Sequence, residues 1–308
     1  MDEEQIKKWS AMGNADWDKA EIQRLARESG KPLEVRCAEA FIKAKWTVRI
    51  GTYYRDTYGE LRELDFWAER ILGFETTGQH GTIQWTVPVR VLGSCKGFPK
   101  NTSPVSYSIS SQSLAIEQPL FMCYSCGIHG SNVTHHLQKI TAEWLLTKLN
   151  TSSRQVVGFD IFHREEDKKK NSKVPAKYSR KGDRDLYKEG LDSSIQATIF
   201  YSNEDKRKPL YLDAHKGFIA LNLPLLVFSL PFWDIPIDTG DAGEPTLRSA
   251  GYHVTVHPSE PPPANPRPPE PLAAILYDVA NITYLTEQLD ELVGKFRGKL
   301  YSILHGGI

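Results

Sequence analysis

Apolar residues recur at helical spacing in the stretch that begins at Pro32. Leu33, Cys37 and Phe41 are each four positions apart, so they fall on one face of a helix. Proline suits the first turn of a helix, where no backbone N–H has an intrahelical partner. The pattern stops at Trp46, which is therefore the expected end of the helix.

Strand-like stretches follow this helix. They are rich in valine, tyrosine and other β-formers and cover residues 47–54, 61–69 and 83–95. Tyr58 and Gly59 stand between the first two stretches and predict a turn. The segment 32–96 is therefore predicted to run helix, strand, strand, strand.

The remainder of the chain shows the same two patterns. Further helices are expected over residues 133–145, around 191–199 and over 284–304. Further strands are expected over residues 155–162 and 218–230, the second as one buried strand or as a strand pair broken at Pro224. Residues 103–113 are rich in serine and are predicted to form a loop.

These elements predict an α/β protein in which a central mixed sheet is flanked by helices. The later strands are expected to extend or cover the sheet begun by residues 32–96. Eight prolines between positions 258 and 271 exclude a helix or a central strand there. The predicted organisation is a helical lead-in (1–31), a core (32–160), a basic loop with an α/β extension (161–257), a flexible proline-rich loop (258–271) and a C-terminal helix (272–308).

Composition narrows the class of protein. Of 308 residues, 40% are hydrophobic and 25% are charged, which suits a folded chain and excludes wholesale disorder. The 38 basic residues balance the 38 acidic residues, which excludes a globally basic nucleic-acid coat. A local basic patch remains open.

Cysteine usage and hydropathy predict a cytoplasmic location. The chain has 4 cysteines, too few for a disulfide scaffold. The first residues lack the apolar centre of a signal peptide. The longest apolar run, residues 217–233, is shorter than the roughly 20 residues that a membrane span needs, and prolines interrupt it.

Three residues in the segment 32–96 have the chemistry of a metal-dependent phosphodiesterase. Such an enzyme needs hard oxygen ligands for Mg²⁺ and a cation near the attacked phosphate. Glu34 belongs to the predicted helix, Asp65 to the second strand and Lys96 to the end of the third. A helix and two adjacent strands can bring these side chains together at one edge of a sheet.

This segment resembles the PD-(D/E)xK nuclease superfamily, in the branch that includes modification-dependent restriction enzymes and Holliday-junction resolvases. The resemblance rests on Leu33-Glu34, Trp46, Tyr54-Arg55-Asp56, Arg62-Glu63-Leu64-Asp65 and Ser94-Cys95-Lys96. It implies a restriction-endonuclease-like core with a site for Mg²⁺ or Mn²⁺. Glu34 and Asp65 match the metal ligands, the Cys95 backbone carbonyl matches a third ligand, and Lys96 matches the catalytic lysine.

The sequence departs from this pattern at Ser94, where the superfamily usually has an acid. A serine hydroxyl is neutral and a weaker ligand, so the site lacks one unit of negative charge. A water or a nearby carboxylate, Glu39 or Glu63, is a candidate to compensate. The departure favours the alternative that the chain is an inactive nuclease fold, used as a nucleic-acid-binding or assembly subunit.

Each residue of the constellation also has a structural interpretation. Glu34 is a favourable first-turn acid for any helix, and Lys96 resembles an ordinary surface lysine. Asp65 stands beside Leu64 in an apolar stretch, where a carboxylate needs a partner or a function. A third hypothesis, an unrelated α/β scaffold with a chance constellation, stays open.

Two other motifs are weaker. Cys123 and Cys126, with histidines nearby, form one CxxC pair, but structural zinc usually needs two close pairs. The structural alternative is a loop with two buried thiols. A thioredoxin-like redox motif is disfavoured because no βαβ pattern frames the pair.

A basic run over residues 168–184 is a candidate phosphate-binding loop or a solvated loop. Its candidate contacts are Lys168, Lys169, Lys170, Lys173, Lys177, Arg180 and Lys181. The expected partner is nucleic acid, with DNA favoured over RNA, and a homo-oligomer or a partner protein is compatible. The first functional hypothesis is a Mg²⁺-dependent endonuclease, by analogy in defence against foreign DNA.

Overall fold

A computed structural model describes most of the predicted elements. It covers Gln23, Ala26 and residues 30–56, 58–78, 81–98, 101–110, 122–126, 154–164, 178–181, 184–207, 216–238, 241–256 and 271–305. The predicted helix 133–145, the basic residues 168–177, the prolines up to 270 and most of the lead-in 1–31 lie outside the described residues.

The first predicted segment is confirmed. Helix α3 spans Lys31–Lys43, and strands β1, β2 and β3 span Thr47–Arg55, Leu61–Gly78 and Gly81–Lys96. The apolar face of α3 is buried as its spacing predicts, with Cys37 and Phe41 fully enclosed. Strand β2 continues nine positions beyond the predicted end at Glu69, because it pairs with β3 as far as Gly78.

The remaining strands are β4 Thr102–Ser110, β5 Met122–Cys126, β6 Arg154–Arg164, β7 Tyr178–Lys181, β8 Lys216–Phe228, β9 Phe232–Asp238, β10 Asp241–Ala242, β11 Thr246–Arg248, β12 Ala250–Val256 and β13 Pro271–Asp278. The remaining helices are α5 Arg184–Arg207 and α6 Ile282–His305, the latter after a 3-10 turn over Val279–Asn281. The predicted strand 155–162 and the predicted helices around 191–199 and 284–304 are confirmed.

All these strands belong to one mixed sheet, so the α/β class is confirmed. Its central path runs β1-β2-β3-β8-β13-β12-β6-β4-β9-β10. Strands β1, β2 and β3 are antiparallel neighbours, whereas β3 pairs with β8 in parallel. The later strands therefore extend the sheet that residues 32–96 begin, as expected.

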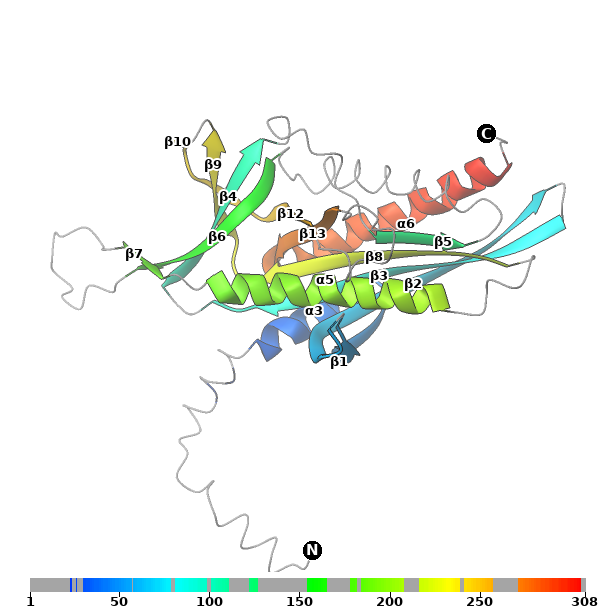
Figure 1. The fold of residues 1–308 in the computed structure, drawn as a ribbon, viewed down its shortest axis with the longest axis horizontal. Helices are drawn as coiled ribbons and strands as arrows, with labels where there is room; N and C mark the ends of the chain where they lie inside the picture. The colour runs from blue at the N-terminus through cyan, green and yellow to red at the C-terminus, as the bar shows by residue number, and fades with distance from the viewer. Residues whose placement is uncertain are drawn as a thin grey trace, which may run out of the picture.

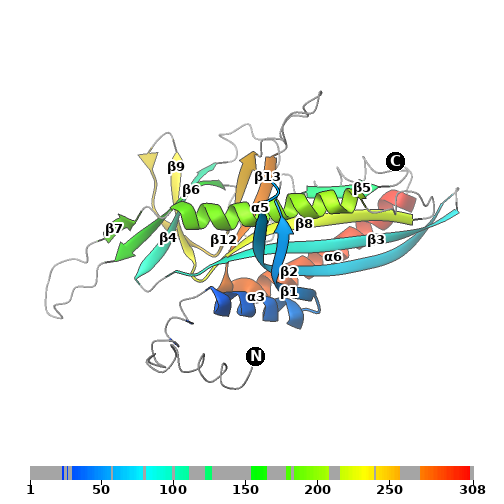
Figure 2. The same ribbon diagram turned by 60° about the horizontal axis from the view of Figure 1, so that its bottom comes forward.

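The sheet has two regions (Figures 1 and 2). In the helix-covered half, α5 lies over one face of β2, β3 and β8, and α3 and α6 lie over the other. Phe41 of α3 and Leu289 of α6 share one apolar cluster with Val91 of β3. The second region, which we call the wing, consists of β4, β6, β9 and β10 at the far end of the strand order.

Two expectations about local structure are wrong, and one open alternative is decided. Residues 103–110 form most of β4 instead of a loop, because they pair with β6 and β9. Of the two alternatives for residues 218–230, the single buried strand is confirmed, because β8 runs through Pro224 as one strand of 13 residues. Cys123 and Cys126 lie in strand β5, paired with β8, and not in a loop.

Among the described residues, no helix combines the length and the apolar character needed to cross a membrane.

Candidate functional site

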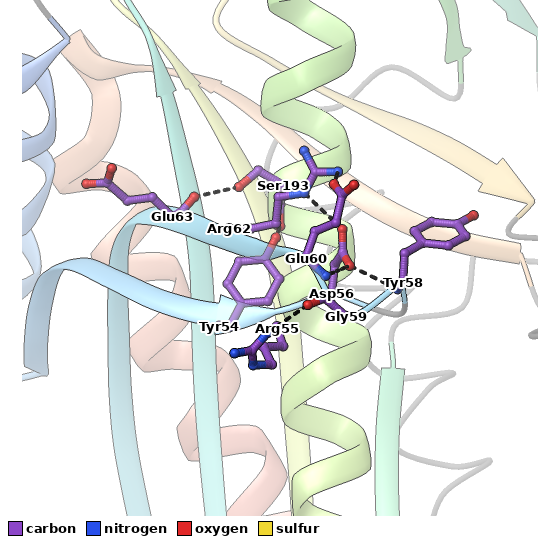
Figure 3. Close-up of polar contacts among 9 residues, drawn as sticks. All are labelled: Tyr54, Arg55, Asp56, Tyr58, Gly59, Glu60, Arg62, Glu63 and Ser193. Atoms are coloured by element: carbon purple, nitrogen blue, oxygen red, sulfur yellow. Dashed lines mark hydrogen bonds and ion pairs between the residues drawn. The ribbon is translucent and has the colours of Figure 1, made fainter.

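The β1–β2 hairpin forms the frame of the candidate site (Figure 3). At its tip, Asp56 Oδ1 accepts hydrogen bonds from the backbone N–H groups of Tyr58 and Glu60, both at 2.9 Å. Arg62 Nε donates to Asp56 Oδ2, also at 2.9 Å. Burial alone would raise the pKa of Asp56, but Arg62 and the two backbone donors outweigh it and lower the pKa. Asp56 is therefore a structural carboxylate that closes the turn.

Helix α5 holds this hairpin through Ser193. Tyr54 Oη donates to the Ser193 carbonyl at 2.7 Å, and Ser193 Oγ donates to the Glu63 carbonyl at 3.0 Å. Burial raises the pKa of Tyr54 to about 12, so its hydroxyl is a permanent donor at neutral pH. Figure 3 shows the Glu63 carboxylate directed away from Ser193. Ser193 thus contacts both strands of the hairpin close to Asp65.

Strand β2 changes its facing at Asp65. Its neighbour Leu64 packs in the cluster that faces Ala197 of α5, whereas Phe66 packs in the cluster that contains Phe41 of α3. Residues two positions apart in a regular strand share a face, so the strand is irregular between them. In the pairing of β1 with β2, Asp65 and Gly51 lie opposite each other but are not among the paired residues, and Gly51 has a φ of +63°. The register is the same on both sides of this position, so no extra residue is inserted in either strand.

The Asp65 side chain reaches across to the end of β3. Its Oδ2 accepts hydrogen bonds from the Cys95 backbone N–H at 2.6 Å and from Ser94 Oγ at 3.0 Å. Ser94 is the position where the superfamily usually has an acid. Here its hydroxyl donates to Asp65, an interaction that a glutamate at this position would replace with charge repulsion unless a cation lay between the two carboxylates.

Glu34 occupies the first turn of α3 beside this group. Its side chain is 5% exposed, and Lys31 Nζ donates to its Oε2 at 2.9 Å. Burial raises the pKa of Glu34; Lys31 opposes the rise, while the nearby Asp65 and Glu63 carboxylates add to it. The Asp65 carboxylate therefore lies near enough to Glu34 to contribute to its raised pKa.

Lys31 is the residue that the sequence analysis missed. Its ammonium also lies 3.3 Å from Glu63 Oε1, so one cation bridges two carboxylates from different elements. The two carboxylates raise the pKa of Lys31, which stays charged. The i,i+3 spacing of Lys31 and Glu34 at a helix start was the available signal.

Lys96 follows Ser94 by two positions in β3, so the strand alternation gives both residues the same face. The Lys96 stem runs against α5 at Gly190, where an added Cβ would lie 2.7 Å from Lys96 Cε. Glycine there leaves room for the lysine. The structure thus brings Asp65 to Ser94, and it places Lys96 on the face of Ser94, which α5 covers, whereas Glu34 belongs to α3 on the opposite face. Among the described residues, Lys96 makes no ion pair to either acid.

The other predicted site residues are less informative. Glu39 is exposed on α3, five positions beyond Glu34. Arg180 and Lys181 lie in β7, whereas Lys168, Lys169, Lys170, Lys173 and Lys177 lie outside the described residues. Within the described part of the chain, no three His, Cys, Asp or Glu side chains form a ready metal-binding group.

The thiols of Cys95 and Cys37 face each other behind the site, with their Sγ atoms 3.8 Å apart. Burial, together with the neighbouring Cys37 thiol, raises the pKa of Cys95 and keeps it protonated. Both thiols pack in the apolar cluster under α3. The side chain of Cys95 therefore serves packing, and only its backbone is available to the site.

Comparisons with protein-family models, with curated proteins and with solved structures find no match to this chain. The functional interpretation therefore rests on the geometry of the site.

Proposed function

We propose that this protein is a metal-dependent nuclease with a restriction-endonuclease-like core. The arrangement of the helix-covered half supports the proposal: α3 precedes three antiparallel strands, and α5 precedes a strand parallel to the third. The helices lie on opposite faces of a mixed sheet (Figure 2). This is the flanked mixed sheet that the superfamily resemblance implies.

The observation that carries the proposal is the meeting of α3, β2 and β3 at Asp65. The irregularity in β2 brings the Asp65 carboxylate to the Ser94–Cys95 peptide, and Glu34 of α3 is coupled to the same carboxylate. A purely structural aspartate does not require a second buried carboxylate beside it, because clustered negative charge destabilises the folded state. Such clustering is expected where a hard cation binds.

The roles follow from this placement. Glu34, Asp65 and the Cys95 carbonyl would hold the metal, and Lys96 would orient the attacking water and stabilise charge on the phosphate. When bound, Mg²⁺ would supply polarisation of the phosphate and a lower pKa for its bound water. In the hydrolysis, the water oxygen bonds to phosphorus as the bond to the leaving sugar oxygen breaks. The basic run, with Arg180 and Lys181 in β7, would contact the backbone of the substrate, for which DNA is favoured.

How well these donors fit a metal depends on the position of Lys31. Carboxylate oxygens are the ligands that Mg²⁺ prefers, and Glu34 and Asp65 supply them. In this structure the Lys31 ammonium takes the place of an external cation between Glu34 and Glu63. The Lys31 side chain is 61% exposed, so it can leave towards solvent as a metal enters. The donors therefore fit once Lys31 is displaced.

The alternative function is an inactive nuclease fold that binds nucleic acid or serves as a subunit. The Ser94–Asp65 hydrogen bond favours it, because Asp65 already has two donors and the site lacks one acid. We propose a cytoplasmic location and a role in defence both for the active nuclease and for the inactive fold.

The test is a cleavage panel on plasmid and oligonucleotide DNA with Mg²⁺ and with Mn²⁺. Lys96→Ala and Asp65→Asn should each reduce cleavage by at least about 100-fold, as expected for the loss of one preorganised electrostatic group. Lys43→Ala and Glu75→Gln, which change exposed residues of α3 and β2, are the matched controls. Cleavage that survives both site substitutions would overturn the nuclease assignment.

Metal binding separates the two forms of the proposal. Calorimetric titration with Mn²⁺ should detect binding to the wild type, and Ser94→Glu should bind more tightly because it adds a hard anionic ligand. Lys31→Gln should also bind Mn²⁺ more tightly, since it removes the competing ammonium. Absence of binding by the wild type, with binding gained by Ser94→Glu, would favour the inactive fold.

A further inference from the structure

The wing contains an open cavity that the proposed catalytic group does not use. Its volume is about 690 Å³, and its walls come from β4, β6, β9 and the segment after β10. The residues that matter for its chemistry are Thr102, Ser103, Phe162, Arg164, Trp233 and Glu244. These strands lie at the opposite end of the sheet order from β2.

The cavity presents aromatic surface to solvent. Trp233 is 41% exposed, although a residue of this size is normally well buried. Phe162 lines the same cavity and is half-buried. Exposed aromatic side chains at the wall of a hollow are typical of sites that stack planar ligands.

Charged groups of both signs border this aromatic surface. Arg164 and Glu244 are exposed, and neither side chain makes an ion pair with another described residue. A guanidinium suits a phosphate, and a carboxylate can accept a hydrogen bond from the exocyclic amino group of a base. An aromatic platform with a cation and a carboxylate in the same cavity therefore suits a nucleotide, whose base can stack and donate a hydrogen bond and whose phosphate can bind the cation.

The neighbouring strand continues the positive charge. Strand β7 pairs with β6 so that Arg180 is opposite Phe162 and Lys181 is opposite Ile161. The backbone register alone places these basic residues beside the strand that supplies Phe162 and Arg164. A chain of phosphates leaving the cavity along this strand would meet further cations.

We propose that this cavity binds one unpaired nucleotide of a single-stranded nucleic acid, with its base stacked on Trp233 and its phosphate at Arg164. The inference rests on the proposed function, because it makes the wing the substrate-binding part of the same nuclease fold. Stacking requires an exposed base face, so a fully paired duplex would not fill the cavity.

The experiment measures the binding of a fluorescein-labelled mixed-sequence 12-nucleotide single strand by anisotropy in EDTA, which excludes cleavage. Trp233→Ala should weaken binding by about 5- to 150-fold, the usual effect of removing one stacking platform. Trp233→Phe should retain most of the affinity. Tyr53→Ala, which removes an exposed aromatic residue on β1 at the other end of the sheet, is the control and should change little.

The salt dependence tests the phosphate contact. Arg164→Gln should flatten the slope of log K against log salt by about 0.7, the contribution of one phosphate on a single strand. Lys43→Gln on α3 is the control. Wild-type affinity in both Trp233→Ala and Arg164→Gln, or equal affinity for the duplex of the same sequence, would overturn the inference.

The failure of this inference and of the nuclease proposal are distinguishable. If Trp233→Ala binds the single strand in EDTA as tightly as the wild type, while Lys96→Ala loses cleavage, the nucleotide-binding role of the cavity is wrong and the nuclease proposal stands. If binding depends on Trp233 but the wild type cleaves no DNA, the cavity proposal is supported and the inactive nuclease fold is favoured.

Discussion

The helix-covered half and the wing solve the same problem of burying a sheet in different ways. In the helix-covered half, β8 is buried along 12 of its 13 positions because α5, α3 and α6 cover both faces. In the wing, Asp234 lies 3% exposed and accepts hydrogen bonds from Ser106 Oγ and Ser108 Oγ, both at 2.9 Å. Apolar contact dominates the first region, which also has a buried ion pair between Arg90 and Asp205, and buried polar contacts help to hold the second. We infer that the wing is the region in which a face of the sheet can stay open for a ligand.

The largest expected effect comes from truncating one aromatic side chain in each of the two regions and comparing the losses of stability. Phe66→Ala should lower the free energy of unfolding by about 3–5 kcal/mol, because it empties a fully buried site between α3 and β3. Trp233→Ala in the wing should cost less than about 1 kcal/mol, as for a surface change. Urea denaturation followed by circular dichroism measures both. Equal losses would show that the wing is as tightly packed as the helix-covered half.

The second effect concerns the polar contacts of the wing. Asp234→Ala removes the carboxylate that accepts from Ser106 and Ser108 and pairs with Arg248, which should cost about 1–3 kcal/mol. Asp241→Ala, at an exposed acid of β10, should stay within about 0.5 kcal/mol. Thermal denaturation of the two variants under one set of conditions is the measurement. A harmless Asp234→Ala would mean that packing, and not this hydrogen-bond group, stabilises the wing.

A smaller loss of stability is expected where α5 contacts the β1–β2 hairpin of the candidate site. Tyr54→Phe removes the hydrogen bond to the Ser193 carbonyl and should cost about 0.5–1.5 kcal/mol. Its neighbour Tyr53 is exposed, and Tyr53→Phe is the matched control. Local hydrogen exchange in β1 should rise in the first variant only. If exchange rose equally in both, the helix contact would not be what holds the hairpin.

The smallest effect is a change of pH dependence at Glu34. Because its pKa is raised in the folded state, its contribution to stability is complete below the ordinary glutamate value of 4.5 and is lost as the pH rises through the raised value. Glu34→Gln resembles the protonated form, so it should reduce that loss. Glu39→Gln, on the exposed side of α3, should leave the pH profile unchanged. Stability profiles from pH 3 to pH 8 without divalent metal decide the point; a steeper loss in Glu34→Gln would contradict it.

Local pattern predicted the helix-covered half well, because its buried faces repeat. The four-residue spacing of Cys37 and Phe41 predicts α3, and the valines of 83–95 predict β3. The wing strand β4 escaped prediction because Ser106 and Ser108 look like loop residues. Their hydroxyls are buried in contact with Asp234, a partner more than one hundred positions away. A side chain whose partner is that distant carries no local signal.

Pro224 shows the same limit of local reasoning. The sequence left open whether this proline, which lacks a backbone N–H, interrupts the strand. On one side of β8, however, β5 pairs only up to Asn222 and β13 begins pairing at Leu225. Pro224 falls between these two partners, where a missing donor costs little.

Within the candidate site, residue types were predictable and contacts were not. Glu34 and Asp65 were named from sequence, and Asp65 contributes to the raised pKa of Glu34, but their role as metal ligands stays a prediction. The Lys31 bridge and the Ser94–Asp65 hydrogen bond depend on how α3 meets an irregular strand. The assignment of Lys96 as the catalytic cation stays a prediction.

The pairing of β3 with β8 has a consequence for how the chain folds during synthesis. Arg90 and Asn222, which meet across these strands, are 132 positions apart. The ribosome must therefore make β4 to β7 and α5 before β3 receives its parallel neighbour, and contacts of such long range form slowly. Until then β3 carries an unpaired edge, the kind of surface that chaperones protect and that aggregates in their absence. Because the strands of the wing are made both before and after β8, neither region can be completed alone, and the nascent chain stays vulnerable until almost its last strand has emerged.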